Sequence, residues 1–422
     1  MSSVLGRREV LAWALYDWAN SAFATVIIAG FFPVFFKSYW SVGVEPTVSS
    51  FRLGVASSVE SLVVLLAAPL LGAIADQGAL KKQLLLGFAA LGVLATAALA
   101  LVGQGAWTLA VILYVAGGIG FAASNIFYDA LIVDVSERES FDLVSAFGFA
   151  LGYLGGGIAL VACIAMTRWP DAFGLGDASE AVRAGFLLTA LWWAVFSLPL
   201  ARVVRQRHTA GALPLGQAFR GGFRQLLRTV QKLRQYRLVA LFLAAYWLYI
   251  DGVDTIVRMA VDYGMALGFP AERLLAALLV VQFVGFPAAL AFGWLGTRLG
   301  PKPGILIGIA AYVGITLWGY WLEALWEFYG IAVAIGLVQG GIQSLSRSLY
   351  ARLIPPEESA EFFGFYNLVG RFAAVIGPAL MGWVALATGD SRVSILSLLV
   401  LFGAGAILLL AVDGRATGRE TG

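Results

Sequence analysis

Long runs of apolar residues, broken by short polar segments, make up most of the chain. A membrane-spanning helix needs roughly 20 mostly apolar residues, and reading the chain in that unit predicts twelve spans. Six lie in the first half, at residues 11–36, 51–75, 83–103, 107–133, 141–166 and 182–201. Six lie in the second half, at residues 238–264, 271–296, 303–322, 326–349, 361–387 and 391–412. The pattern predicts an all-α membrane protein whose first span stays attached, because its apolar run is too long for a signal peptide.

Composition supports this class and excludes several others. The 422 residues are 60% hydrophobic and 13% charged, whereas a soluble domain carries about 25% charged residues. Nucleic-acid binding and disorder do not fit such a chain. One cysteine, Cys163, and one histidine, His208, leave no internal disulfide and no histidine-rich metal site. No phosphate-binding loop, HExxH motif or metal-spaced Cys/His set occurs, so we predict no enzyme activity, no metal and no cofactor.

Lys and Arg residues are unevenly distributed over the segments between the spans. With a cytoplasmic N-terminus, 19 of them fall on the inner side and six on the outer side. This bias predicts a multi-pass cell-membrane protein, in the inner membrane of a double-membraned bacterium, with both termini in the cytoplasm. The linker 202–237 carries nine Lys/Arg and no acid. Its apolar residues recur at helical spacing, which predicts an amphipathic helix on membrane lipids; an ordinary positive-inside loop is the simpler interpretation.

Three echoes at similar offsets relate the two halves of the chain. The segment from Gly72 to Lys82 after the second span resembles the segment from Gly293 to Lys302 after the eighth. Trp13, Asp17 and Asn20 match Trp247, Asp251 and Asp254, while Asn125 and Gly155 match Arg347 and Gly377. We therefore predict two pseudo-symmetric six-helix halves, 1–201 and 238–422, joined by the linker 202–237.

The loop after the second span resembles the major facilitator superfamily signature G-x-x-x-D-x-x-G-x-[KR]. It departs from that signature because its second glycine, Gly78, comes one place early, and the later copy has Thr297 where the acid would be. Four strings are more specific: YDWANSAFATVI (16–27), APLLGAIAD (68–76), QSLSRSLYARLIP (343–355) and AEFFGFYNLVGR (360–371). With these strings the chain resembles, across all twelve spans, a bacterial-type member of the vacuole-effluxer family. That resemblance implies the major facilitator fold and transport; the fungal members export amino acids from the vacuole.

Polar residues form a stripe on one face of each of four predicted spans. An intramembrane charge is costly, so it normally faces the protein interior and often marks a substrate or ion path. The stripes comprise Asp17 and Asn20 in span one, Asn125 and Asp129 in span four, Asp251, Asp254 and Arg258 in span seven, and Gln339, Gln343 and Arg347 in span ten. The resemblance implies that these four spans line a central cavity. We expect these ten residues to bind substrate or coupling protons.

Internal pairing is the competing interpretation of the same charges. Asp254 and Arg258 are four residues apart on one helix, and Arg347 could pair with Asp17 or Asp251 across the bundle. Four further polar residues are candidates for gating or secondary roles: Glu60, Asp76, Asn367 and Arg371. Arg371 could close the cavity or pair with Glu60.

We predict a monomeric secondary transporter that exports a small polar or zwitterionic solute, with an amino acid favoured, by alternating access. Charges of both signs suit an ammonium and a carboxylate, with Arg347 for the carboxylate. We predict that a proton carried by Asp17 or Asp251 is the coupling ion. The alternative is an uncoupled facilitator or an exchanger, in which these acids only pair with arginine. The alternatives are an exporter of amphipathic lipid or drug-like compounds and a non-transporting scaffold or sensor.

Overall fold

The structure, a computed structural model, describes residues 2–207, 217, 236–372 and 376–412. Over these ranges the chain is helical, without strands, and eleven helices are long and apolar enough to cross a membrane. A shorter apolar helix, Ile376–Thr388, adds to them. The predicted all-α membrane fold is confirmed. The basic linker helix and His208 fall in 208–235, outside the described residues apart from Gln217, so those expectations stay predictions.

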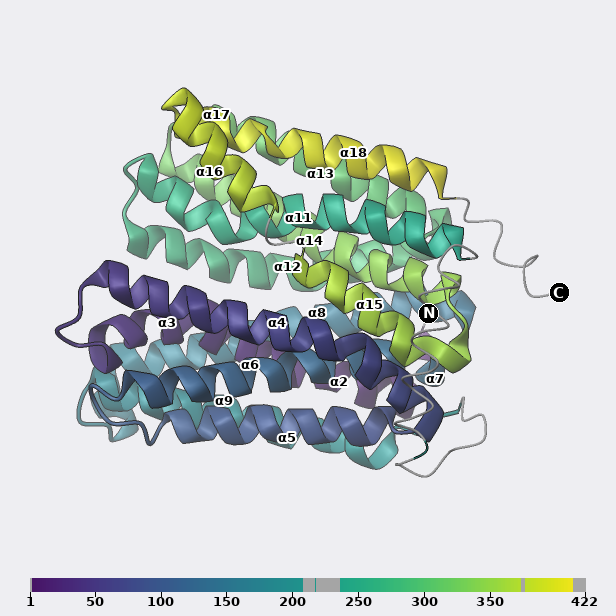
Figure 1. The fold of residues 1–422 in the computed structure, drawn as a ribbon, viewed down its shortest axis with the longest axis horizontal. Helices are drawn as coiled ribbons and strands as arrows, with labels where there is room; N and C mark the ends of the chain where they lie inside the picture. Colours follow the sequence, from purple (N-terminus) through teal and green to yellow (C-terminus); the bar gives the residue numbers. More distant parts are fainter. Residues whose placement is uncertain (1, 208–216, 218–235, 373–375, 413–422) are drawn as a thin grey trace.

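The first half of the chain contributes six spans, seen in purple to teal in Figure 1. The first runs through α2 (Arg8–Ala22), the π-helical η1 (Phe23–Phe31), α3 (Phe32–Phe35) and η2 (Phe36–Trp40). The others are α4 (Pro46–Gly78), α5 (Lys81–Leu99), α6 (Trp107–Ala130), α8 (Phe141–Arg168) and α9 (Ala178–Val203). Short helices α1 (Ser2–Leu5) and α7 (Ile132–Val135) flank them. Within this group α2 packs on α8 and α9, and α5 packs on α6.

The second half is drawn in green to yellow and lies beside the first. Its helices are α11 (Arg237–Ala266), α12 (Ala271–Leu299), α13 (Pro301–Tyr320), α14 (Leu325–Leu353), α15 (Ser359–Phe372), α16 (Ile376–Thr388), α17 (Ser391–Leu396) and α18 (Leu398–Ala411). Here α12 and α13 pack on α14, and α11 packs on α18. Of the predicted span 361–387, the structure describes α15 and α16, and residues 373–375 between them lie outside the described residues.

Two helix pairs hold the halves together. We call the packing of α4 on α15 the first joint and that of α8 on α12 the second joint. Glycine allows the close approach in both. A methyl group on Gly72 would overlap the backbone carbonyl of Ala360, and one on Gly293 would lie 2.5 Å from the Cβ of Ala146. The repeated glycine therefore has a role in packing, because Gly72 and Gly293 each let helices of opposite halves touch.

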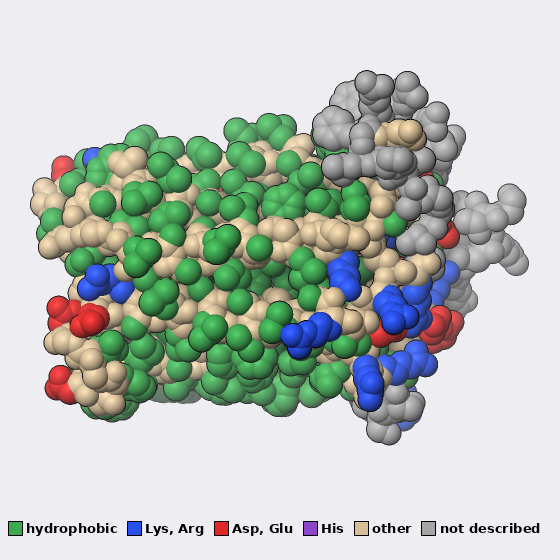
Figure 2. Space-filling view, turned by 90° about the horizontal axis from the view of Figure 1, so that it is seen from below, with side chains coloured by type: hydrophobic (Ala, Val, Ile, Leu, Met, Phe, Trp, Pro, Cys, Tyr) green, Lys and Arg blue, Asp and Glu red, His purple; other side chains and the backbone are tan. Residues whose placement is uncertain are grey.

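Charged side chains gather at the ends of the molecule and are scarce on the long face between them. Figure 2 shows a surface that is almost entirely hydrophobic side chains and backbone along its length, with most Lys and Arg toward one end. That end, which we call the terminal end, is where the described chain begins and where α18 ends (Figure 1). Large apolar side chains such as Leu66, Leu94 and Leu386 are exposed, as expected for a surface in contact with lipid.

Candidate substrate cavity

A polar cavity of about 380 Å³ lies where helices of the two halves meet. The first half supplies residues of α2, α6 and α8, and the second half supplies residues of α11, α12, α14 and α15. Seven of the fourteen candidates line it: Asp17, Asn20, Asn125, Asp129, Gln343, Arg347 and Asn367. Residues far apart in sequence thus come together, so a solute here would touch both halves at once.

Arg347 on α14 is the central charge of this cavity and is 2% exposed. Its NH1 group donates to Asp129 Oδ1 at 2.9 Å, forming an ion pair between the halves. Its Nε donates to Ser145 Oγ and its NH2 to the Ser145 carbonyl, both at 2.8 Å. The guanidinium also lies 4.4 Å from the ring centroid of Phe149. We expected Asp17 or Asp251 as the paired acid, and the structure places a different carboxylate, Asp129, there.

Asp129 on α6 is held by the second half through two groups. Besides Arg347, Asn367 on α15 donates to Asp129 Oδ2 at 3.1 Å. Asn367 also donates to the Phe363 carbonyl at 3.0 Å, which fixes its orientation. One carboxylate therefore links α6 to both α14 and α15. Because breaking a buried pair leaves an uncompensated charge, a solute that takes one partner must supply the missing interaction.

Asp17 and Asn20 form the first-span side of the cavity. Asp17 is half-buried and accepts hydrogen bonds from Tyr128 at 3.2 Å and from Ser21 at 3.3 Å. Asn20 donates to Asn125 Oδ1 at 2.5 Å, which joins α2 to α6 within the first half. No described cation lies within ion-pair distance of Asp17, although the charge of Arg347 in the same cavity acts on it. Asp17 is thus a second carboxylate that faces the cavity.

Asp251, the counterpart of Asp17 in the repeat, has a different position. It is fully buried and accepts from the backbone N–H groups of Ile376 at 3.1 Å and Gly377 at 2.9 Å, and from Thr255 at 3.3 Å. Its carboxylate therefore binds the first two described N–H groups of α16, as an N-cap side chain does. This placement differs from our expectation that Asp251 faces the cavity.

The remaining candidates lie away from the polar cavity or outside the description. Asp254 is half-buried on α11 and is not among the described residues that line the cavity. Glu60 is buried against Gly118 of α6, inside the first half. The structure describes the helices but not the side chains at Arg258 and Arg371. Their expected pairing with Asp254 and Glu60 therefore stays a prediction.

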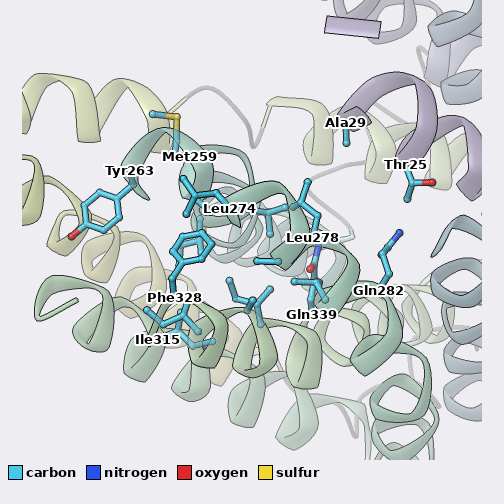
Figure 3. A pocket seen from close by; sticks show the side chains of 18 of the residues that line it. Thr25, Ala29, Met259, Tyr263, Leu274, Leu278, Gln282, Ile315, Phe328 and Gln339 are labelled. Carbon is cyan, nitrogen blue, oxygen red and sulfur yellow. The ribbon is translucent and has the colours of Figure 1, made fainter. Parts of the chain in front are cut away.

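An apolar cavity of about 510 Å³ adjoins the polar one and shares Ala24, Thr25, Tyr153 and Gln282 with it. Figure 3 shows Gln282, Gln339 and Thr25 near one end and Tyr263, Phe328 and Ile315 near the other. Gln339, a predicted site residue, lines this apolar cavity and not the polar one.

Sequence reasoning missed several residues of the site. Gln282 on α12 lines both cavities, and Tyr153 and Tyr366 line the polar cavity. Gln282 is a polar residue in an apolar span, a signal that was present but lay outside the four spans with polar stripes. Trp13, beside the polar stripe of the first span, serves packing: it stacks on Tyr128 with 4.4 Å between ring centroids and is fully buried.

Buried charges close the terminal end of the first joint. Asp76 at the end of α4 accepts from the backbone N–H groups of Ala360 at 3.1 Å and Glu361 at 2.8 Å, at the start of α15. Lys81, 1% exposed, lies 3.5 Å from Asp76 and 3.4 Å from Asp134, and donates to Ser359 at 2.7 Å. These contacts hold the halves together at the terminal end, whereas the apolar cavity lies toward the opposite end.

Comparison with known proteins agrees with this architecture. Residues 5–135 and 133–422 match the family described as vacuole effluxer Atg22 like. The chain belongs to this family. It is 38% identical to the uncharacterized MFS-type transporter YxiO of Bacillus subtilis (strain 168) over 403 residues, covering 95% of this chain and 94% of that one. The family resemblance seen in the sequence is confirmed.

The fungal relatives are more distant and longer. Autophagy-related protein 22 of Pyricularia oryzae is 28% identical over 66% of this chain, and the match spans 44% of that protein. Autophagy-related protein 22 of Gibberella zeae is 24% identical over 98% of this chain and 80% of its own length. The match thus leaves part of each fungal protein uncovered, and the fungal substrates do not carry over by identity alone.

Solved structures show the same fold at low sequence identity. The proton:xylose symporter XylE matches with a TM-score of 0.73 at 14% identity, covering 98% of this chain and 96% of that one. The human organic anion transporter MFSD10 matches with a TM-score of 0.69 at 17% identity, covering 96% and 99%. The protein is thus a multi-pass membrane transporter of the major facilitator superfamily.

Proposed function

We propose that this Atg22-like transporter exports a small zwitterionic solute, with an amino acid as the favoured class, through alternating access between the two halves. The observation that carries this proposal is the Arg347–Asp129 ion pair at the cavity, 2.9 Å long and formed between the halves. A solute carboxylate can replace Asp129 on the Arg347 fork, and its ammonium can meet Asp17 and the released Asp129. Binding then exchanges one inter-half contact for another, which couples occupancy to movement of the halves.

The direction of opening follows from the two ends of the molecule. Contacts of Asp76, Lys81 and Asp134 close the terminal end, and the apolar cavity leads toward the other end. With both termini in the cytoplasm, as the charge bias predicts, this is an outward-facing state of a cell-membrane protein. Reporter fusions at residues 210 and 422 should signal from the inner side and those at 45 and 175 from the outer side. An outer-side signal at 210 would reverse the assignment.

The test of the substrate site is substitution of Arg347. Arg347→Lys should weaken binding of amino acids at least tenfold, because a point charge replaces a planar fork. Arg347→Ala should abolish amino-acid-induced thermal stabilisation of the purified protein. Arg298→Ala is the matched control, since Arg298 lies exposed over the Trp294 ring at 5.2 Å and should leave binding unchanged.

A purely structural role of Arg347 has a distinct signature. In that case Arg347→Ala would fail to fold because Asp129 is left without its cation, and the double variant Arg347→Ala/Asp129→Ala would fold again. Recovery of amino-acid transport in that double variant would exclude Arg347 from the substrate site.

Proton coupling is the second part of the proposal, and Asp17 is its carrier. Asp17 faces the cavity and is held by hydroxyl groups only, Tyr128 and Ser21, among its described contacts. In proteoliposomes with an imposed pH gradient, the unmodified protein should accumulate an amino acid against its gradient. Asp17→Asn should keep exchange and lose accumulation. Flux that is indifferent to the pH gradient and to a protonophore would rule out coupling.

An amphipathic lipid or drug-like substrate is the second candidate, and the apolar cavity favours it. Of the residues labelled in Figure 3, only Thr25, Gln282 and Gln339 bear polar groups apart from the Tyr263 hydroxyl. That hydroxyl is already used, because it donates to the Gly319 carbonyl at 2.8 Å. The amino-acid panel and a panel of amphipathic cations, measured on the same preparation, separate the two candidates.

A further inference from the structure

The apolar cavity extends away from the inter-half cavity into the second half itself. On the second-half side its walls come from α11, α12, α13 and α14, with Met381 of α16, Ile395 of α17 and Leu398 of α18, while the first half contributes residues such as Phe31, Val34 and Leu160. The side chains of Met381, Ile395 and Leu398 are at most 8% exposed. This part of the cavity thus lies inside one six-helix half, beyond the surface where the two halves face each other.

The volume is too large to be a packing imperfection. Protein interiors contain few voids larger than a water molecule, and this cavity measures about 510 Å³. An engineered apolar cavity of about 150 Å³ stays dry and binds benzene. The present volume falls within the range of about 300–1,000 Å³ seen for small-molecule sites. An apolar ligand fills such a space better than water does, because its walls offer water few partners.

One buried polar atom lies at the junction of the two cavities. Gln339 Oε1 is shielded from solvent and has no hydrogen-bond partner among the described side chains. Figure 3 shows Gln339 on the same side of the apolar cavity as Gln282, which lines both cavities. An unsatisfied buried acceptor costs free energy. A ligand that donates a hydrogen bond to Gln339 Oε1 therefore removes this cost, and its own donor is also satisfied.

We infer that the part of the apolar cavity lined by the second half binds a hydrocarbon chain, and that the zwitterionic solute of the proposed function is an amphiphile, with an amino-acid-like head and a long apolar chain. Its donor-bearing head lies in the polar cavity, within reach of Gln339, and its chain extends along Leu274 and Phe328 toward Ile315. The inference rests on the proposed transport function and specifies its substrate class. The chain that this site holds is longer than a typical amino-acid side chain.

The experiment uses straight-chain 2-amino acids with side chains of one to eight carbons and the protein in nanodiscs. Each compound is added at concentrations below those at which it self-associates. Thermal stabilisation gives the apparent Kd of each compound. Alanine tests the polar head alone. Each added methylene should tighten binding roughly fourfold, from about 0.8 kcal/mol per buried CH₂, until the chain fills the cavity. Partition into the nanodisc lipid is the same for every variant and cancels in the comparison.

Cavity-filling variants localise the chain. Ala277 and Ala332 both line the cavity and are 3% and 4% exposed. Ala277→Leu and Ala332→Leu should leave alanine binding unchanged and should weaken the longest compounds at least tenfold. Ala291→Leu, at an exposed site on the same helix as Ala277, is the matched control and should leave the whole series unchanged. Gln339→Leu should weaken every member of the series by a similar factor.

Three outcomes overturn the inference or its basis. Alanine binding with no gain from longer chains would reject the hydrocarbon site while leaving the proposed transport function intact. Absence of binding and transport for every compound would reject the proposed function itself. The third outcome is that a membrane lipid co-purifies with the unmodified protein at one molecule per chain and is lost in Ala332→Leu, while the Kd does not change along the amino-acid series. That result would show that a resident lipid, not the substrate, fills the cavity.

Discussion

The two joints between the halves occupy equivalent places in the repeat but are held differently. In the first joint an acid at the end of α4, Asp76, reaches the backbone N–H groups that begin α15. In the second joint the equivalent position is Thr297, which donates to the Trp294 carbonyl of its own helix at 2.7 Å. There the acid comes from the other side, since Asp142 of α8 accepts from Arg352 of α14 at 2.8 Å and from Ser348.

The contrast shows that a repeated motif keeps its packing more readily than its charges. Gly72 and Gly293 both allow helices of opposite halves to touch. An ion pair between the halves needs only one carboxylate on either side. The first joint therefore depends on one residue that binds two backbone groups, whereas beside the second joint the contact between the halves is a side-chain pair from α8 to α14.

The largest expected effect is that of Asp76→Ala. It leaves Lys81, 1% exposed, with less compensation and removes the cap of α15. Breaking a buried pair costs about 3–5 kcal/mol, which should lower thermal stability and open the terminal end. A cysteine introduced at Ala351, now 3% exposed, should become reactive to a thiol reagent. Thr297→Ala is the control and should change stability by less than about 0.5 kcal/mol; equal effects would show that the joints are equivalent.

The next prediction compares Gly72 in the first joint with Gly293 in the second joint. Overpacking costs about 1–3 kcal/mol, so Gly72→Ala and Gly293→Ala should both destabilise the protein in thermal unfolding. Ala146→Gly should restore the Gly293→Ala variant, because the methyl group that clashes there belongs to a side chain. No such repair exists for Gly72, which faces the backbone of Ala360. Failure of the Ala146→Gly repair would mean that backbone contacts limit the second joint too.

A smaller effect concerns the Asp142–Arg352 pair. The Arg352 side chain is 21% exposed, so solvent weakens the interaction relative to the first joint. A double-mutant cycle with Asp142→Asn and Arg352→Gln should give a coupling energy of about 1 kcal/mol. A value as large as the loss in Asp76→Ala would contradict the asymmetry.

The smallest effect is expected from restoring the missing acid. Thr297 is exposed, and its hydroxyl already bonds within its own helix. Thr297→Asp should therefore change thermal stability by no more than about 0.5 kcal/mol. A clear stabilisation would reveal that the second joint retains a site for the acid.

Sequence alone anticipated the helices and the family, and seven of its fourteen candidate residues line the polar cavity, because apolar run length and intramembrane charge are local signals. The ion-pair partner of each charge could not be predicted from neighbouring residues in the sequence. Arg347 pairs with Asp129 and not with Asp17, since the approach of α14 to α6 depends on packing across the whole bundle. Asp17 and Asp251 occupy matching sequence positions, yet one faces the cavity and the other caps α16. The apolar cavity gave no signal because its lining looks like ordinary core.

The cap that Asp251 forms also bears on how the protein is assembled in the membrane. The backbone N–H groups of Ile376 and Gly377, at the start of the described part of α16, find their acceptor on α11, and a backbone donor left unbonded in hydrocarbon is costly. We therefore expect α16 to settle in the lipid only once α11 is already there, so that the second half completes its insertion as a unit rather than helix by helix.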